Sequence, residues 1–151
     1  MSDKTDFIKA LKSTVDKLAA GLAVALDIQY ADIDDNPNGG ELFRSESKAI
    51  LVEFNVLSEN PVDPLYVGSF NIGARTVNDP GNYDNLSLVG IVSDLFPQNS
   101  RIEIMDYSEV LAPSAVKGIL NPERVVINPQ FSDMSTGIRM ATVHFLAQRF
   151  T

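Results

Sequence analysis

The longest hydrophobic pattern lies near the N-terminal end of the chain, from Thr5 to about Ile28. Apolar residues recur there at the spacing of one helix face, and they are Phe7, Leu11, Val15 or Leu18, Leu22 and Leu26. This pattern predicts a long amphipathic helix that covers a sheet. The alternative is a helix lying on a membrane surface, which is disfavoured because the polar side carries little net positive charge.

Five later stretches follow the period of a β-strand, in which successive side chains point to opposite faces. They are Ala49–Leu57, Leu65–Ala74, Arg101–Tyr107, Glu123–Asn128 and Ile138–Arg149. The first two are joined by a short loop, so we expect them to pair antiparallel. The first and the last are partly apolar on both faces, which is typical of strands that touch a partner as well as the core. Gly73, close to the end of the second stretch, predicts a bulge or bend.

A second, shorter helix is predicted just before Pro97. Leu88, Ile91 or Val92, and Leu95 share one face of it, and Asp84 or Asn85 can cap its start. Pro97 ends it because proline has no N–H to donate. With the strands, this predicts a single α+β domain over residues 1–151. Its sheet is curved, mainly antiparallel and of about four to six strands, packed by the long N-terminal helix and the short second one.

Turn-forming and acidic residues dominate the segment from Tyr30 to Gly40. Within it, Asp34-x-Asn36-x-Asn38-Gly39 matches the first half of a calcium-binding loop. The match ends at the twelfth position, where Ser45 replaces the bidentate glutamate, and Pro37 interrupts the loop. A solvated turn is therefore the favoured interpretation.

A polar loop is also predicted from Arg75 to Tyr83, because Asp-Pro-Gly is a strong turn signal. Loops of this kind commonly carry partner contacts. The residues that we predict to contact a partner or another copy come from this loop and from the last strand: Arg75, Asn78, Asp79, Arg139 and Arg149. The segment Ser108–Pro122 remains open between a loop and one helical turn over Ser114–Leu120.

The chain shows no catalytic signature. His144 is the only histidine, and its place between Val143 and Phe145 in a strand favours a packed or edge residue over a catalytic base. Cysteine is absent, which removes thiolate chemistry and cysteine metal sites, and a single histidine makes a transition-metal site poor. No glycine spacing fits a phosphate-binding loop. We therefore predict a protein that is not an enzyme, with no catalytic, cofactor-binding or metal-binding residue and no cofactor.

Composition and charge limit the partners. Of the 151 residues, 44% are hydrophobic and 21% are charged, which is ordinary for a globular domain. The net charge of −8 argues against binding to phosphate backbones or anionic lipid surfaces. No apolar run approaches the roughly 18 residues of a membrane span. These features predict a soluble protein made and kept inside a cell, or inside something assembled there.

The order of the predicted elements resembles that of the tail-terminator (tail-completion) proteins of long-tailed bacteriophages. The strongest part is Asp94-Leu95-Phe96-Pro97 followed by the amphipathic strand Arg101–Tyr107. The likeness spans most of the chain in order and length, and Ser108–Pro122 looks like an insertion relative to the shortest members. It implies an α+β subunit that forms a homo-hexameric ring, caps the tail tube, stops tube polymerisation and presents the surface that joins the head.

The resemblance also implies particular partners and a place of action. These partners are further copies of the chain, the major tail tube protein and a head–tail connector or head-completion protein. Genomic DNA would pass through the lumen without specific binding, and no membrane is involved. The location implied is the head–tail junction of the virion, after assembly in the bacterial host cytoplasm. Two alternatives remain open: another neck or minor tail component, and a small α+β ligand-binding domain or enzyme.

Overall fold

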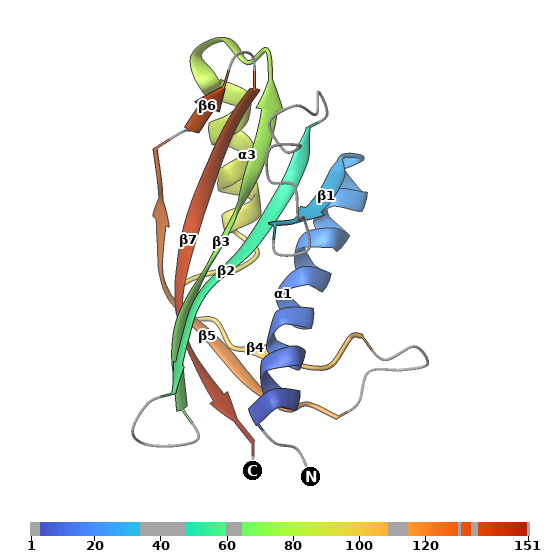
Figure 1. The fold of residues 1–151 in the computed structure, drawn as a ribbon, viewed down its shortest axis with the longest axis vertical. Helices are drawn as coiled ribbons and strands as arrows, with labels where there is room; N and C mark the ends of the chain where they lie inside the picture. The colour runs from blue at the N-terminus through green and yellow to red at the C-terminus, as the bar shows by residue number, and fades with distance from the viewer. Residues whose placement is uncertain are drawn as a thin grey trace.

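The computed structural model describes residues 4–33, 48–59, 65–108, 115–129, 131–133 and 136–150. Its elements follow the order α1 (Lys4–Leu26), β1 (Gln29–Asp32), β2 (Ala49–Glu59), β3 (Leu65–Val77), the 3-10 helix η2 (Pro80–Asn82), α3 (Tyr83–Ser93), β4 (Ile102–Ile104), β5 (Gly118–Ile127), β6 (Phe131–Asp133) and β7 (Thr136–Arg149). The strands form one curved sheet, with α1 and α3 packed on the same face of it (Figure 1). The predicted α+β architecture is confirmed.

The sheet runs in the order β1-β2-β3-β7-β5-β4, and β6 pairs with β7 off this path. Every pair is antiparallel except β1 with β2. The two longest strands, β3 and β7, pair at its centre without a register shift. Of the bulge or bend predicted at Gly73, the bulge is therefore wrong. The register shifts lie in β2, between Phe54 and Val56, and in β5, between Pro122 and Arg124.

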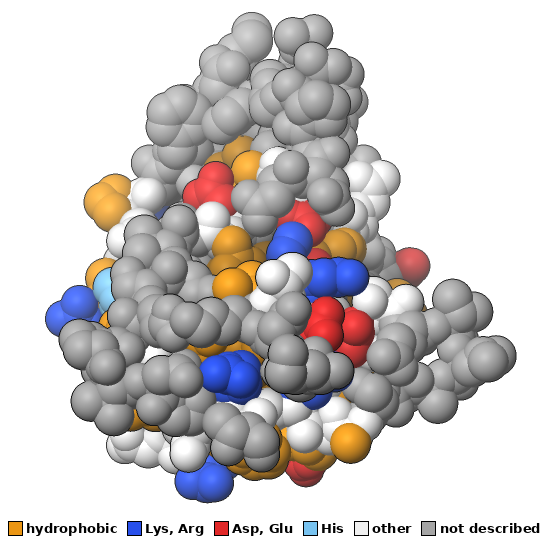
Figure 2. Space-filling view, turned by 60° about the horizontal axis from the view of Figure 1, so that its bottom comes forward, with side chains coloured by type: hydrophobic (Ala, Val, Ile, Leu, Met, Phe, Trp, Pro, Cys, Tyr) orange, Lys and Arg blue, Asp and Glu red, His pale blue; other side chains and the backbone are white. Residues whose placement is uncertain are grey.

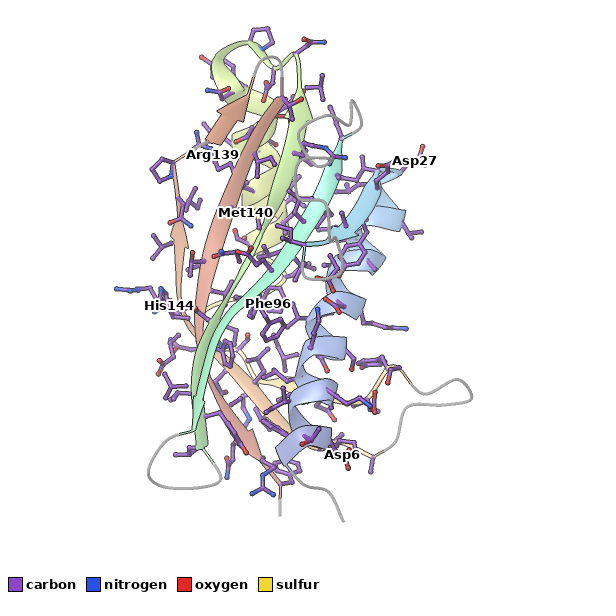
Figure 3. The ribbon with its side chains drawn as sticks, viewed as in Figure 1. Asp6, Asp27, Phe96, Arg139, Met140 and His144 are labelled. Carbon is purple, nitrogen blue, oxygen red and sulfur yellow. The ribbon has the colours of Figure 1, made fainter. Side chains whose placement is uncertain are left out.

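The main core lies between the sheet and the two helices. The predicted stripe of α1 is confirmed, since Phe7, Leu11 and Val15 are fully buried. Phe70 of β3 is the centre of an aromatic cluster, with its ring centroid 4.8 Å from that of Phe96. Phe96 follows α3 and projects into the space between the sheet and α1 (Figure 3). This cluster joins both helices to one apolar core.

Two hydroxyl groups dock α1 onto the segment that follows β4. The Thr14 hydroxyl accepts a hydrogen bond from the backbone N–H of Met105 at 3.1 Å. The Ser13 hydroxyl donates to the Met105 carbonyl at 2.9 Å and accepts from the Tyr107 N–H at 3.1 Å. Two side chains of α1 thus satisfy backbone groups after β4 that no described strand pairs.

Replacing Thr14 by valine is expected to lower the free energy of unfolding by about 1–3 kcal/mol, because the Met105 N–H loses its buried acceptor. Urea denaturation followed by circular dichroism measures this change. Thr5→Val on the exposed start of the same helix is the matched control, and its effect should stay within about 0.5 kcal/mol. Equal effects of the two substitutions would contradict the docking role of Thr14.

Helix α3 differs in detail from the prediction. Its buried residues are Asn85, Val89 and Val92, so the sheet-facing stripe uses Val92 and leaves Ile91 41% exposed. The predicted caps, Asp84 and Asn85, lie inside the helix. The helix ends at Ser93, before Pro97 is reached.

Two further segments are strands where the sequence predicted turns. Tyr30 and Asp32 belong to β1, which pairs parallel with β2. Gly118–Leu120 begins β5, so neither the predicted helical turn nor the loop occurs there. The calcium-like motif from Asp34 to Ser45 lies outside the described residues.

Candidate interaction surface

A polar network ties α3 to the sheet at one end of the molecule. The Arg139 Nε of β7 donates to the Asn85 Oδ1 at 2.8 Å, and its Nη1 donates to the Asn128 carbonyl at 3.0 Å. Asn85 is fully buried, and its Nδ2 lies 3.4 Å from the Thr76 hydroxyl of β3. A buried amide is stable at this core position because its polar atoms have partners on both central strands.

Asp79 caps the N-terminal end of α3, the end at which Asn85 lies. Its carboxylate accepts hydrogen bonds from the backbone N–H groups of Asp84, at 3.1 Å, and Asn85, at 2.8 Å. Asn82, the residue at the N-cap position, makes no side-chain cap. Desolvation alone would raise the pKa of Asp79, but these two bonds and one from the Thr76 hydroxyl hold the pKa below its ordinary value of 3.8.

Asp79→Ala is expected to destabilise the protein by about 0.5–2 kcal/mol near neutral pH, because two N–H groups of the first helical turn lose their acceptor. A lowered pKa in the folded state stabilises above the unfolded-state pKa, and this contribution is lost as pH falls through the folded-state pKa. Thermal melts of both proteins from pH 7 to below pH 3 should therefore converge at the acid end. A constant difference would contradict the charged cap.

The other predicted contact residues fall in different surroundings. Arg75 does not lie in a loop: β3 continues through it, its side chain is 2% exposed, and burial lowers its pKa. Asn78 is exposed and has a left-handed backbone with φ of 50°. Arg149 lies at the opposite end of β7, paired in register with Gly118. The structure thus joins Asp79 and Arg139 through Asn85 and leaves Arg149 apart, and partner contact by these residues stays a prediction.

A row of polar side chains crosses the sheet face opposite the helices. Asn71 Nδ2 donates to Glu53 Oε1 at 3.1 Å, and the Thr142 hydroxyl donates to Asn71 Oδ1 at 2.7 Å. Asn128 Nδ2 then donates to Thr142 at 2.8 Å. We call Glu53, Asn71, Thr142 and Asn128 the polar row. The alternation of side chains along β3 and β7 indicates the polar row, because Asn71 and Thr142 lie on the sheet face opposite the buried core residues.

The same outer face carries His144. Its Nε2 lies 3.4 Å from the guanidinium of Arg124 on the neighbouring strand β5. The His144 side chain points away from the helices in Figure 3, and the histidine is accessible at the surface in Figure 2. Among the described residues, no group of three or more His, Cys, Asp or Glu side chains is placed to hold a metal ion. None of the helices in the described part is long and apolar enough to cross a membrane.

An open groove lies on the other side of the molecule, with a cavity volume of about 320 Å³. Its lining residues come from α1, β1 and the segment after β4, and they are Ser13, Asp16, Lys17, Ala20, Tyr30, Tyr107 and Ser108. Burial raises the pKa of Asp16, although a hydrogen bond from the Tyr30 hydroxyl at 2.8 Å and the nearby Lys12 partly offset this. The groove is at the lower limit of the size of small-molecule sites.

No protein-family model matches the chain, and no curated protein matches it. Among solved structures, it is similar to that of a protein designated only by a sequence identifier. The TM-score is 0.64, the sequence identity is 11%, and the match covers 99% of this chain and 99% of the other. At this identity the likeness shows the fold alone. The same fold therefore extends over nearly the whole length of that second chain.

Proposed function

We propose that this chain is a structural subunit of a bacteriophage virion that acts at the head–tail junction. Copies of it form a ring on the end of the completed tail tube, stop tube polymerisation and provide the surface that the head joins. The mechanism is geometric: one side of the ring binds the last ring of tube subunits, and the other side cannot accept another. The chain itself performs no chemistry.

One observation carries the proposal: both helices pack on one face of a curved sheet, and the opposite face has no helix over the described residues (Figure 1). A sheet face that no described helix covers, and that carries hydrogen-bonded polar side chains, suits contact with other protein surfaces or with a water-filled lumen. The element order also agrees with the resemblance found in the sequence. A net charge of −8 on each subunit would let DNA pass without adhering.

The groove beside Asp16 favours a second candidate, a small ligand-binding domain. Its side chains offer a carboxylate, two tyrosines and a lysine, which is enough to orient a small polar ligand. However, Asp16 is already engaged by Tyr30 and Lys12. The groove is also small and open, so we place this candidate second.

Tail length in virions tests the proposal. In a phage that encodes this chain, deleting its gene should give tails longer than normal that lack heads, and supplying the full chain should restore uniform tails. Electron micrographs give the length distribution directly. Tails of normal length that fail to join heads would instead assign the chain to another neck component. Normal virions would overturn a structural role altogether.

A further inference from the structure

One margin of the sheet leaves part of strand β5 without a neighbouring strand. β5 pairs with β7 along one side, whereas β4 covers only Gly118–Leu120 on the other side. Just beyond β4, the Asn99 N–H donates to the Pro122 carbonyl at 2.8 Å. Within the residues that the structure describes, no strand pairs with Arg124–Ile127 on that side (Figure 1). We call Arg124–Ile127 the open edge.

The ladder between β5 and β7 shows which backbone groups the open edge directs outward. The Asn128 N–H donates to the Met140 carbonyl of β7 at 2.9 Å, so the backbone of Asn128 faces β7. Residues of an antiparallel strand alternate between its two sides, and Val126 therefore faces β7 as well. Val125 and Ile127 then direct their N–H and C=O groups away from β7. Such an edge is a template for a further strand.

The side chains of the open edge give it an apolar surface on both faces of the sheet. Ile127 lies on the helix side and is 49% exposed, because α3 packs on β3 and β7. Val126 lies on the outer face and is 37% exposed. Proteins usually protect an edge strand with charges, prolines or a covering element, so exposed β-branched residues here indicate a strand partner.

The open edge is complementary to itself under a two-fold axis that passes beside Val126. In that arrangement Val125 of one copy lies opposite Ile127 of the other, and the reverse pair lies across the axis. Each outward N–H and C=O of these two residues then gains a hydrogen-bond partner. Pro122 and Pro129, which have no N–H to donate, bound the paired segment at its two ends.

Polar groups at the ends of this pairing are complementary as well. The axis places Arg124 of one copy opposite Asn128 of the other, with both side chains on the outer face. The Asn128 amide nitrogen donates to Thr142 at 2.8 Å, so its amide oxygen is the atom that accepts from the opposing guanidinium. No like charges lie opposite each other, whereas an axis at Arg124 would bring two guanidinium groups together. Charge therefore agrees with the axis at Val126.

We propose that the open edge of β5 binds the open edge of a second copy, so that two chains join their sheets antiparallel. This inference goes beyond the proposed function and does not depend on it. A two-fold contact closes after two copies, whereas a ring needs contact between two different patches. The pairing therefore belongs to the free chain, where it covers an edge that would otherwise add strands of other proteins.

Disulfide trapping tests this pairing, because the chain has no cysteine of its own. The axis places Val126 of the two copies opposite each other in a non-hydrogen-bonded pair, with Cα atoms about 4.5 Å apart. That separation suits a disulfide. Full-length Val126→Cys, oxidised in solution, should therefore form a covalent homodimer on a non-reducing gel.

Two other single-cysteine variants are the matched controls. Val67→Cys lies on the same outer face with 41% exposure, but in β3 and away from the open edge. Arg124→Cys lies on the open edge and on the same face, but the axis places its two copies several residues out of register. We expect each control to give at least tenfold less covalent dimer than Val126→Cys. Equal trapping of all three would overturn the pairing, as would no trapping of Val126→Cys.

A further variant removes only an outward donor. Ile127→Pro deletes an N–H that the ladder between β5 and β7 does not use, and edge strands tolerate proline. Added to Val126→Cys, it should reduce the trapped dimer at least tenfold while circular dichroism stays native. An undiminished dimer would contradict strand pairing.

Sedimentation equilibrium of the unaltered chain gives a readout that needs no substitution. A monomer–dimer equilibrium supports the pairing, and a monomer at every concentration overturns it, whether or not the proline variant folds. Tail length after gene deletion tests the proposed function separately. A trapped dimer with unchanged tails rejects the proposed function alone, and overlong tails without a trapped dimer reject this contact alone.

Discussion

Replacing Phe70 by alanine is expected to lower the free energy of unfolding by about 3–5 kcal/mol. Phe70 is fully buried in β3, and its ring touches three others: Phe54 at 5.7 Å, Phe96 at 4.8 Å and Phe145 at 5.8 Å between centroids. Alanine would remove the apolar contact area and leave a cavity that the rigid central strands cannot close. Urea denaturation gives the change as a lower midpoint.

The matched control for this substitution is Phe150→Ala. Phe150 follows β7 and is 45% exposed, so its removal costs much less apolar burial. We expect the control to change the free energy of unfolding by under about 1 kcal/mol. If Phe70→Ala were equally mild, the aromatic cluster would not be the centre of the core. A loss of cooperativity with Phe70→Ala would agree with its role in joining both helices to the sheet.

The elements that the sequence predicted well are those with a strong period over many residues. Helix α1 and strands β2, β3 and β7 each carry a regular apolar face that packs in the main core, so the spacing of their apolar residues predicts that contact directly. Strand β1 was missed because it is short and polar. Its Asp32 is satisfied by Lys12 of α1 at 2.5 Å, and its strand partner lies about twenty residues further along the chain. Neither of these two contacts can be recognised from the local pattern of residues around β1.

The candidate site was less predictable than the fold, because its polar residues act through tertiary partners. Asn85 occupies a core position at which the helix pattern predicts an apolar residue. It is stable there because Arg139 and Thr76 form hydrogen bonds with its side-chain amide. Asp79 caps a helix from three residues before the N-cap position, through the turn formed by η2. The short pairing of β4 with Gly118–Leu120 of β5 could not be predicted either, since it depends on where β4 stops.

Replacing Gly73 by alanine is expected to destabilise the protein by about 1–3 kcal/mol or more, because the two central strands meet without room for a side chain. An added Cβ would lie 2.1 Å from the Arg139 carbonyl oxygen and 2.6 Å from the Met140 Cα. Both are backbone atoms, so the clash is relieved only by shifting β3 against β7. That shift would strain the hydrogen bonds of the longest strand pair.

Gly21→Ala in α1 is the matched control, because a Cβ there would meet nothing within 4 Å. Alanine is the better helix former, so this change should stabilise the protein by up to about 1 kcal/mol. The same substitution is thus expected to have opposite signs in two elements of one chain, and parallel urea titrations measure both. A neutral Gly73→Ala would mean that β3 and β7 are further apart, and the alignment of Asn71 with Thr142 in the polar row would then be lost as well.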